Sequence, residues 1–318
     1  MRDKDDLTIT RAVRASYNLK VDKLTWCDSL YLRRVAARLE ARDKTYKLKR
    51  FAGTQQRLQT LANGYQQVAA CRLHEFPTWH RTAQGKAYIR VQGQLLYLLD
   101  WVHGKPFEHT SAHAYALGRT LRKLHVPPRS RQSFTTPSLR RRIDQIEQVT
   151  TLLSNKDSTL HLPSVARDFI TVQTDALVPL LKTSMRMLKE LGPKLSYVMV
   201  HGDVTVPNVL MNGRTAVLID WERLSLGFAM EELAKTVMNT CNLSIPHARA
   251  LLAGYGWSSL SDDAKAAFGV FLQIPREVNY LLLRASRRRP SKADRAQWKL
   301  VMDTWAERQR LFEALVDV

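Results

Sequence analysis

The chain has 318 residues, of which 45% are hydrophobic, so it is long enough for two lobes and apolar enough to bury a sizeable core. It has no run of about 18 apolar residues and its first residues are charged, so neither a membrane-spanning helix nor a secretory signal is expected. Its three cysteines, Cys27, Cys71 and Cys241, are scattered, which argues against a disulfide framework or a zinc cluster and favours a reduced, cytoplasmic setting.

Basic residues give the chain a formal net charge of +20. Such a charge favours anionic partners such as nucleic acid, phosphorylated molecules, an acidic polymer or an anionic surface, but a solvated basic surface fits equally well. The densest basic segments are 284–295 and 139–143, and neither carries an aromatic ladder or a nucleic-acid motif. A solvated surface is the favoured interpretation of these segments. An anionic polymer stays an alternative partner, and nucleic acid a less favoured one.

Residues 1–100 predict a small β-rich lobe. A short helix is expected at 7–17, and a longer one from Thr54 to about residue 73, where apolar residues recur at spacings of three and four. Strand-like runs bounded by turn residues lie at 24–28, 35–41, 45–51, 87–92 and 95–101. Five strands and one crossing helix therefore precede the first clear change in pattern.

Residues 101–318 predict a larger and mostly helical lobe. Helices are expected at 114–125, 138–155, 164–191, 229–243, 246–254, 261–285 and 292–316. A short β insert interrupts them, with strands at 197–203, 209–212 and 216–221. The predicted fold is α+β and bilobal, with a small N-terminal antiparallel β-sheet lobe followed by a larger helical lobe, the element order of protein-kinase-like proteins.

The segment 198–222, VMVHGDVTVPNVLMNGRTAVLIDWE, carries the chemistry. A strand ends at a His-Gly-Asp turn, Asn208 follows Asp203 by five residues, and a hairpin then delivers Asp220 beside that loop. Phosphoryl transfer needs an oriented hydroxyl nucleophile and neutralised phosphate charge. Asp203 would accept the hydroxyl proton, and Asn208 and Asp220 would supply the hard oxygen ligands that suit Mg²⁺. Each short motif is weak by itself, but their combination at this spacing is specific.

HGDVTVPNVL followed by AVLIDWE resembles the catalytic and metal-binding segments of the aminoglycoside phosphotransferase/choline kinase superfamily. Further stretches at 11–24, 35–51, 82–107 and 271–286 are similar to bacterial spore coat protein S type kinase-like proteins. The resemblance implies a protein-kinase-like fold and the cofactors ATP and Mg²⁺.

The resemblance also implies roles for residues outside this segment. Lys49 matches the lysine that grips the α and β phosphates, and Lys47, on the same strand face, is its rival. The hinge whose backbone would bond adenine corresponds to Leu99, Asp100 and Trp101. The alternative for either lysine is an ordinary exposed strand residue.

Glu232 falls where the family usually has an Asp that braces the His-Gly-Asp turn, although an acid at a helix N-terminus is also favoured by the helix dipole. His201 would orient the loop without transferring protons. The sequence departs from the family pattern at two places. The first strand connection, about 29–34, has no glycine to close over phosphates, and the stretch 54–74 has no Glu to pair with Lys49.

The sequence therefore predicts an ATP- and Mg²⁺-dependent phosphotransferase that acts on a hydroxyl of a small molecule or carbohydrate. The alternative is a weak or inactive pseudokinase that acts by binding, for example in spore coat assembly. The acceptor is not specified, but a net charge of +20 disfavours a polycationic one. A cytoplasmic location, with or without association with a spore coat, fits both hypotheses.

Overall fold

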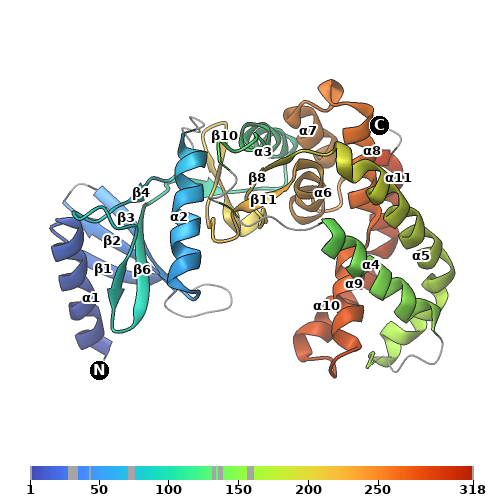
Figure 1. Ribbon diagram of the computed structural model, residues 1–318, viewed down its shortest axis with the longest axis horizontal. Coiled ribbons are helices and arrows are strands. Elements are labelled where there is room, and N and C mark those ends of the chain that lie inside the picture. Colours follow the sequence, from blue (N-terminus) through green and yellow to red (C-terminus); the bar gives the residue numbers. More distant parts are fainter. Residues whose placement is uncertain are drawn as a thin grey trace.

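The computed structural model describes residues 2–27, 35–42, 44–70, 76–130, 134, 139–155 and 161–316. Two lobes lie side by side, a small one with a large share of sheet and a larger one made mainly of helices (Figure 1). The chain starts in the small lobe and ends in the large one. The predicted α+β, bilobal architecture is therefore confirmed.

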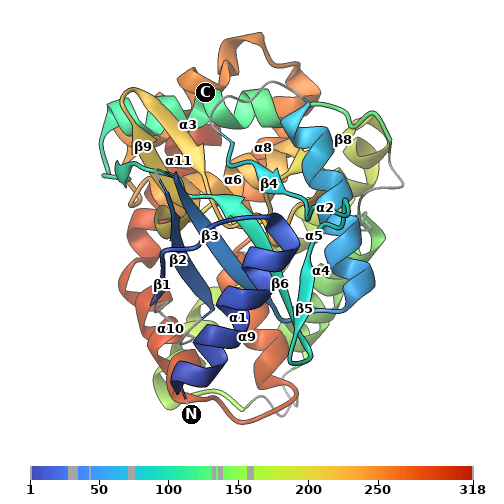
Figure 2. The ribbon, with the colours of Figure 1, turned by 90° about the vertical axis from the view of Figure 1, so that its left-hand side faces the viewer.

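The small lobe is an antiparallel sheet between two helices. Its elements are α1 (Arg2–Tyr17), β1 (Lys23–Cys27), β2 (Ala36–Ala41), β3 (Lys44–Phe51), α2 (Gln55–Ala69), β4 (Trp79–His80), β5 (Ile89–Val91) and β6 (Gln94–Asp100). The strand order is β1-β2-β3-β6-β4, and β5 also pairs with β6. α1 covers the outer face of the sheet, and α2 lies on the side toward the large lobe (Figures 1 and 2). All five predicted strands are confirmed, whereas β4 is too short to leave a periodic signal in the sequence.

β3 and β6 divide their side chains between two faces, because successive residues of a strand point to opposite sides. Leu48 and Leu98 are paired across these strands and pack with Val13 of α1 in a small core. The alternate residues Lys47 and Lys49 belong to the other face and line a pocket between the lobes. The strand period therefore places both lysines where a ligand can meet them.

α2 connects the small lobe to the large one. The helix begins after Thr54, whose hydroxyl accepts a hydrogen bond from the Arg57 N–H at 3.2 Å. Its buried residues belong to the main core of the molecule and are Leu58, Leu61, Tyr65 and Val68. Because this core also includes residues of the large lobe, the two lobes share one hydrophobic core.

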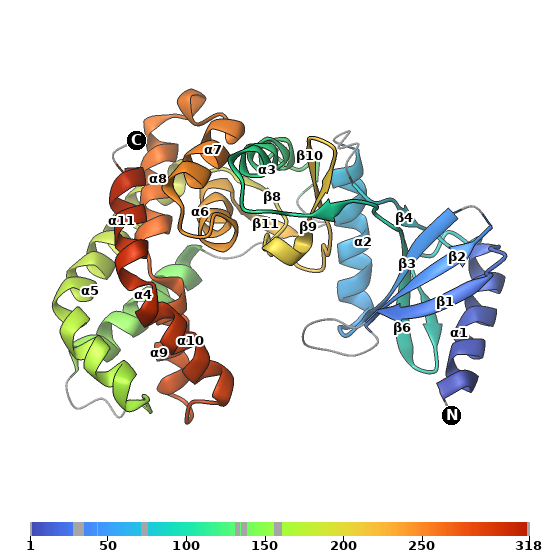
Figure 3. The ribbon, with the colours of Figure 1, turned by 180° about the vertical axis from the view of Figure 1, so that it is seen from behind.

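The large lobe contains the remaining elements. They are β7 (Lys105–Pro106), α3 (Ser111–Leu124), α4 (Leu139–Ser154), α5 (Ser164–Leu191), η2 (Gly192–Lys194), β8 (Tyr197–Val200), η3 (Val206–Asn208), β9 (Val209–Asn212), β10 (Thr215–Leu218), β11 (Ser225–Phe228), α6 (Ala229–Thr240), α7 (Ile245–Tyr255), η4 (Trp257–Ser259), α8 (Asp262–Gln273), α9 (Arg276–Ala285), α10 (Lys292–Asp303) and α11 (Trp305–Val316), where η marks a 3-10 helix. β9 pairs with β10 and β7, and β8 pairs with β11 (Figure 3). The predicted β insert therefore forms two small sheets next to α2.

Two helices that the sequence predicts as continuous are divided in the structure. The helix expected at 261–285 breaks into α8 and α9, because Pro275 has no N–H to continue the helix and forces Ile274 into an extended conformation. The helix expected at 292–316 is interrupted at Thr304, whose hydroxyl donates to the Leu300 carbonyl at 2.7 Å. The prediction of continuous helices was wrong at both positions.

Two further expectations from the sequence concern membrane-spanning helices and the connection at 29–34. Across the described ranges, no helix is both long and apolar enough to cross a membrane. The glycine-free connection at 29–34 lies outside the described residues, so its predicted effect on phosphate binding stays a prediction.

Candidate active site

The His-Gly-Asp turn follows β8 and is held from behind by Glu232 of α6. The two carboxylate oxygens of Glu232 accept hydrogen bonds from the backbone N–H groups of His201, at 3.0 Å, and Gly202, at 2.6 Å. Gly202 has a φ of +82°, and an added Cβ would lie 2.5 Å from the Arg223 carbonyl oxygen. Glycine is therefore required here by both conformation and space. The bracing role that the resemblance implies for Glu232 is confirmed.

His125, the residue that ends α3, completes the support of Glu232. Its Nε2 lies 2.9 Å from Glu232 Oε2, and its Nδ1 lies 2.8 Å from the Tyr255 hydroxyl. Burial by itself would raise the pKa of Glu232, but the hydrogen bond from His125 and the donors of the turn outweigh it and lower that pKa. The sequence analysis did not find His125, because nothing near it in the chain marks a contact with a residue 107 positions away.

Asn208 lies between Asp203 and the end of β10. Its side-chain N–H group donates to the Asp203 backbone carbonyl at 2.9 Å. Its side-chain oxygen, Oδ1, has no donor among the described residues and is left to bind a ligand. The Ile219 N–H donates to the Asn208 backbone carbonyl at 2.9 Å, and His201 Nε2 lies 3.0 Å from the Ile219 carbonyl. These bonds hold the residue before Asp220 against the loop that carries Asp203. The three residues predicted from the segment are therefore brought together.

Lys49 reaches from β3 to the IDWE segment of the large lobe. Its ammonium contacts Asp220 Oδ1 and lies 3.1 Å from Glu222 Oε1. The Tyr97 hydroxyl donates to the same Glu222 oxygen at 3.0 Å. Lys49 is only 5% exposed, so it needs such partners. The carboxylate that the sequence analysis sought in the helix after Lys49 is supplied in this structure by Glu222, from the other lobe.

Asp220 combines an unusual backbone with a charged neighbour. Its φ is +68°, in the left-handed region that residues other than glycine seldom adopt. Burial alone would raise the pKa of its carboxyl group, but the Lys49 ammonium outweighs burial and lowers that pKa. Asp220 is therefore an ionised oxygen donor, and together with the free carbonyl oxygen of Asn208 it fits a hard divalent cation.

Lys47 lies in the same pocket but differs from Lys49 in its surroundings. Among the described residues it has no ion pair, and burial together with the nearby Lys49 lowers its pKa. Lys49 contacts both acidic residues, whereas Lys47 contacts neither. The geometry therefore favours Lys49 over Lys47 as the residue that meets phosphate.

A pocket of about 240 Å³ lies between the lobes. Its lining includes all the residues that the sequence analysis assigned to nucleotide binding, together with one metal-ligand candidate, namely Lys49, Leu99, Asp100, Trp101 and Asp220. Aliphatic residues form most of the remaining wall, including Val35, Ala36 and Ile219. A pocket with a mostly aliphatic wall and a few charged groups has the chemistry required by a nucleotide.

The hinge backbone is partly engaged within the sheet. The Asp100 N–H donates to the Thr78 carbonyl at 2.9 Å, and the Trp101 N–H donates to the Thr45 carbonyl at 3.2 Å. Within the described part of the chain, the Val102 N–H has no hydrogen-bond acceptor. Val102 also lines the pocket, so it is a free donor that sequence reasoning missed because a backbone group leaves no mark in the residue types.

A second pocket, of about 520 Å³, lies within the large lobe and has Asp203 in its wall. Its lining is rich in charged groups, with the basic residues Arg142, Arg223, Lys235 and Arg276 and the acidic residues Asp203, Glu231, Glu232 and Glu277. The Asp203 carboxylate is partly exposed to it and has Arg223 Nε at 3.9 Å. A partly exposed carboxylate at the wall of a polar pocket is placed to meet a second substrate.

The sequence pattern of the phosphotransferase enzyme family matches residues 28–268, which is more than half of the chain and includes the turn, the loop and the hairpin described above. The chain belongs to this family. It is therefore a phosphotransferase by family, in agreement with the resemblance seen in its sequence. No curated protein sequence matches the chain.

Solved structures of the family have the same overall fold as this phosphotransferase. An aminoglycoside phosphotransferase from Alicyclobacillus acidocaldarius is 15% identical, with a TM-score of 0.76 over 96% of this chain and 94% of that chain. A spectinomycin phosphotransferase, in complex with ADP and spectinomycin, is 15% identical, with a TM-score of 0.67 over 98% of both chains. A microcompartment-associated aminopropanol kinase is 16% identical, with a TM-score of 0.66 over 97% of this chain and 98% of that chain. At these identities the likeness establishes the kinase-like fold.

Proposed function

We propose that this phosphotransferase is an ATP- and Mg²⁺-dependent kinase that phosphorylates a hydroxyl group of a small molecule or carbohydrate. The observation that carries the proposal is the position of Asp203, Asn208 and Asp220 between two pockets. Asp220 lines the pocket between the lobes, Asp203 lines the pocket in the large lobe, and Asn208 bonds to Asp203 between them. A nucleotide in the first pocket and an acceptor in the second would meet at these residues.

In this mechanism the acceptor hydroxyl gives its proton to the Asp203 carboxylate as its oxygen bonds to the γ-phosphorus, while the bond from that phosphorus to the β–γ bridging oxygen breaks and ADP leaves. Asn208 and Asp220 would hold Mg²⁺, which would neutralise charge on the phosphates. The Val102 N–H, which has no acceptor among the described residues, would bond adenine at the hinge formed by Leu99, Asp100 and Trp101.

Lys49 would grip the phosphates once a metal occupies Asp220. Its ammonium contacts Oδ1 of Asp220, so a metal that binds this oxygen would displace the ammonium toward the nucleotide. Glu222, at 3.1 Å, and Tyr97, which bonds Glu222, would keep the ammonium in the cleft during that rearrangement. Glu222 thereby performs the task that a helix Glu has in the family pattern.

The similar structures support a small-molecule acceptor. Their names refer to spectinomycin, aminopropanol and choline, and two of them contain ADP with spectinomycin or AMP-PNP with Ca²⁺. A nucleotide and a divalent cation are therefore bound by proteins with this fold. We extend both to this chain on the strength of its own Asp203, Asn208 and Asp220.

Two measurements test the proposed kinase. ATP with Mg²⁺ at about millimolar concentration should raise the melting temperature of the protein, because a ligand that binds only the folded state stabilises it. ATP consumption should then be screened against sugars, amino alcohols and nucleosides, and Asp203→Asn should lower the turnover of the best acceptor by about 100-fold or more. Equal turnover by wild type and variant would show that Asp203 is not the base, and no thermal shift would contradict nucleotide binding altogether.

A nucleotide-binding protein with little turnover is the second candidate, and the contact between Lys49 and Asp220 favours it. If that contact persists with ATP and Mg²⁺ present, Oδ1 of Asp220 stays unavailable to the metal and the protein acts by binding. A thermal shift without ATP consumption on any acceptor would identify this case. A role in spore coat assembly and a cytoplasmic location stay predictions of the sequence analysis.

A further inference from the structure

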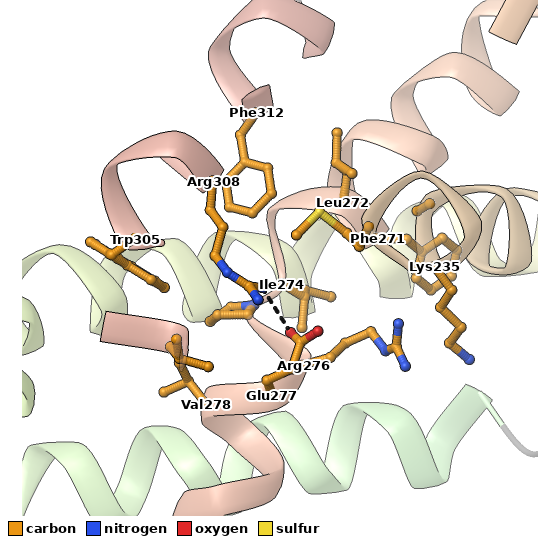
Figure 4. A pocket seen from close by; sticks show the side chains of 14 residues that line it. Lys235, Phe271, Leu272, Ile274, Arg276, Glu277, Val278, Trp305, Arg308 and Phe312 are labelled. Atoms are coloured by element: carbon orange, nitrogen blue, oxygen red, sulfur yellow. Dashed lines mark ion pairs between the residues drawn. The ribbon is translucent and has the colours of Figure 1, made fainter. Parts of the chain in front are cut away.

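The pocket beside Asp203 contains more positive charge than its own acids neutralise. Its four basic residues are matched in number by four acidic ones, but the acids differ in what they bind. Glu232 is committed to His125 and to the two N–H groups of the turn. Glu277 lies 3.3 Å from Arg308, which does not line this pocket. Figure 4 shows this pair in a neighbouring pocket, which Glu277 and Arg308 both line. Neither acid is available to a cationic ligand.

Besides Asp203, Glu231 is the acid of the described lining whose ion-pair partners lie within the pocket, and three cations surround it. Arg142 Nη2 lies 2.8 Å from its Oε1, and the Lys235 ammonium contacts the same oxygen. Arg276 is the third cation. Lys235 and Arg142, and to a smaller extent Arg276, lower the pKa of the Glu231 carboxyl group against the opposing effect of burial. One carboxylate therefore faces three positive groups.

Arg276 is the cation without a partner. Within the described ranges its guanidinium makes no hydrogen bond and no salt bridge, although it is only partly exposed. Figure 4 shows its side chain directed away from the Glu277–Arg308 pair and toward Lys235. It lies in the first turn of α9, where the helix dipole is unfavourable for a cation. Glu277 and Glu231 act on this partly buried guanidinium only through space, so its fork-shaped donors lack the directly bonded anion that they suit.

Asn279 supplies a second and independent sign of a ligand. It lies one turn beyond Arg276 on the same face of α9 and is 9% exposed, and its side-chain oxygen has no hydrogen-bond donor within the described residues. Buried polar atoms without a partner are uncommon in folded proteins. This oxygen is an acceptor, so it would accept a hydrogen bond from an O–H or N–H group of a bound molecule.

We propose that the acceptor is an anionic hydroxyl compound, with its carboxylate or phosphate group paired to Arg276, a donor group bonded to Asn279 and the reacting hydroxyl at Asp203. This assignment of substrate class rests on the proposed kinase function. It excludes polycationic acceptors such as aminoglycosides, because only Asp203 and the fully shared Glu231 would face their ammonium groups.

Matched pairs of ligands test this proposal by isothermal titration calorimetry. The acids are glycerate, gluconate and glycerol 3-phosphate, and their uncharged counterparts are glyceramide, gluconamide and glycerol. We expect at least one acid to bind about tenfold more tightly than its counterpart, and Arg276→Gln to remove that preference. Comparing the carboxylates with glycerol 3-phosphate shows which anionic group the site takes.

Arg287→Gln is the control, because it removes the same charge from an exposed position near the end of α9 without touching the pocket. It should leave the preference for acids unchanged. Equal affinity for acids and counterparts, no binding of any acid, or a preference for ethanolamine over the acids would overturn the proposal.

Nucleotide binding is measured separately, through the thermal shift with ATP and Mg²⁺. A shift without a preference for acids overturns the substrate class and leaves the kinase standing. A preference for acids that Arg276→Gln removes, without any shift, leaves the anion site standing and overturns the kinase.

Discussion

Lys49 depends on residues that lie far from it in the chain. It is buried, and its partners Asp220 and Glu222 belong to the other lobe, about 170 residues further on. A buried ammonium that loses a carboxylate becomes less well held and less well placed. The two acids are separated by Trp221, which packs against His201 of the turn and Tyr65 of α2. These contacts hold the IDWE segment against both elements.

Glu222→Gln tests the role of Glu222 in holding Lys49. The substitution keeps the shape of the side chain but removes its charge, so the ammonium is bound less firmly. We expect the KM for ATP to rise by about tenfold, because a charge-assisted hydrogen bond contributes on the order of 1.5 kcal/mol. Steady-state kinetics at saturating acceptor measures it. Glu307→Gln, an exposed position in α11, is the control, and an unchanged KM in Glu222→Gln would contradict the role.

Glu232 makes the stability of the folded protein depend on pH. The pKa of its carboxyl group is lowered from 4.5 in the folded state. A group with a lowered folded pKa contributes stability that is fully present above the unfolded value and is lost as the pH falls toward the folded value. Glu232→Gln should therefore lower the free energy of unfolding at pH 7 by about 2 kcal/mol.

Urea unfolding at pH 7 and at pH 3.5 measures this effect. The difference between wild type and Glu232→Gln should shrink at the lower pH, because the Glu232 carboxyl group takes up a proton there more readily in the unfolded wild type than in the folded one. A difference that stays the same at both pH values would contradict the assignment of the charge to Glu232.

The position of Asp203 depends on the His-Gly-Asp turn after β8. Gly202 and Gly213 both have positive φ, at +82° and +59°, but they differ in the space around them. An added Cβ at Gly202 would lie 2.5 Å from the Arg223 carbonyl oxygen, whereas at Gly213 it would meet nothing within 4 Å. The two glycines therefore separate the effect of conformation from the effect of contact.

Gly213→Ala should cost about 1 kcal/mol of stability, which is the ordinary penalty of the left-handed region. Gly202→Ala should cost about 3 kcal/mol or more, because the turn must also move away from Arg223. That movement displaces Asp203, so activity should fall in Gly202→Ala and persist in Gly213→Ala. Denaturant unfolding and ATP consumption measure the two effects, and equal losses in both variants would show that the contact at Gly202 is unimportant.

In the large lobe, a proline divides a helix that the periodicity of the sequence predicts as continuous. Periodicity predicted one helix over 261–285, but Pro275 divides it into α8, which ends at Gln273, and α9, which begins at Arg276. That break has a consequence for the site, because it places Arg276 and Asn279 in the wall of the pocket beside Asp203. The proline was visible in the sequence, whereas the residues of α9 that reach the pocket depend on packing.

The whole molecule combines two lobes with a shared core and a net charge of +20. The charge acts at a distance on anionic ligands and is screened by salt. Raising the salt concentration from about 0.1 M to about 1 M shortens the Debye length from about 10 Å to about 3 Å. The affinity for ATP with Mg²⁺ should therefore fall several-fold over this range, as measured by calorimetry. Adenosine is the control, and an equal loss of affinity for adenosine would show that the charge is not responsible.

The sequence by itself determined the local parts of this protein. Strand alternation, helical periodicity and turn residues gave the five main strands of the small lobe and most of the helices. The spacing of Asp203, Asn208 and Asp220 along one short segment already predicted that the three residues lie close together. The predicted bracing by Glu232 and the family itself also followed from residues close to this segment.

The tertiary structure alone decided the contacts between distant segments. It paired Lys49 with Glu222, placed His125 behind Glu232 and gathered three cations around Glu231. It also left the Val102 N–H without an acceptor in the part of the chain that the structure describes. None of these has a periodic or a nearest-neighbour signal, because each depends on how lobes and helices pack. Sequence pattern reports what a residue does to its own element, whereas the partner of a buried charge is fixed only when the core between the elements has formed.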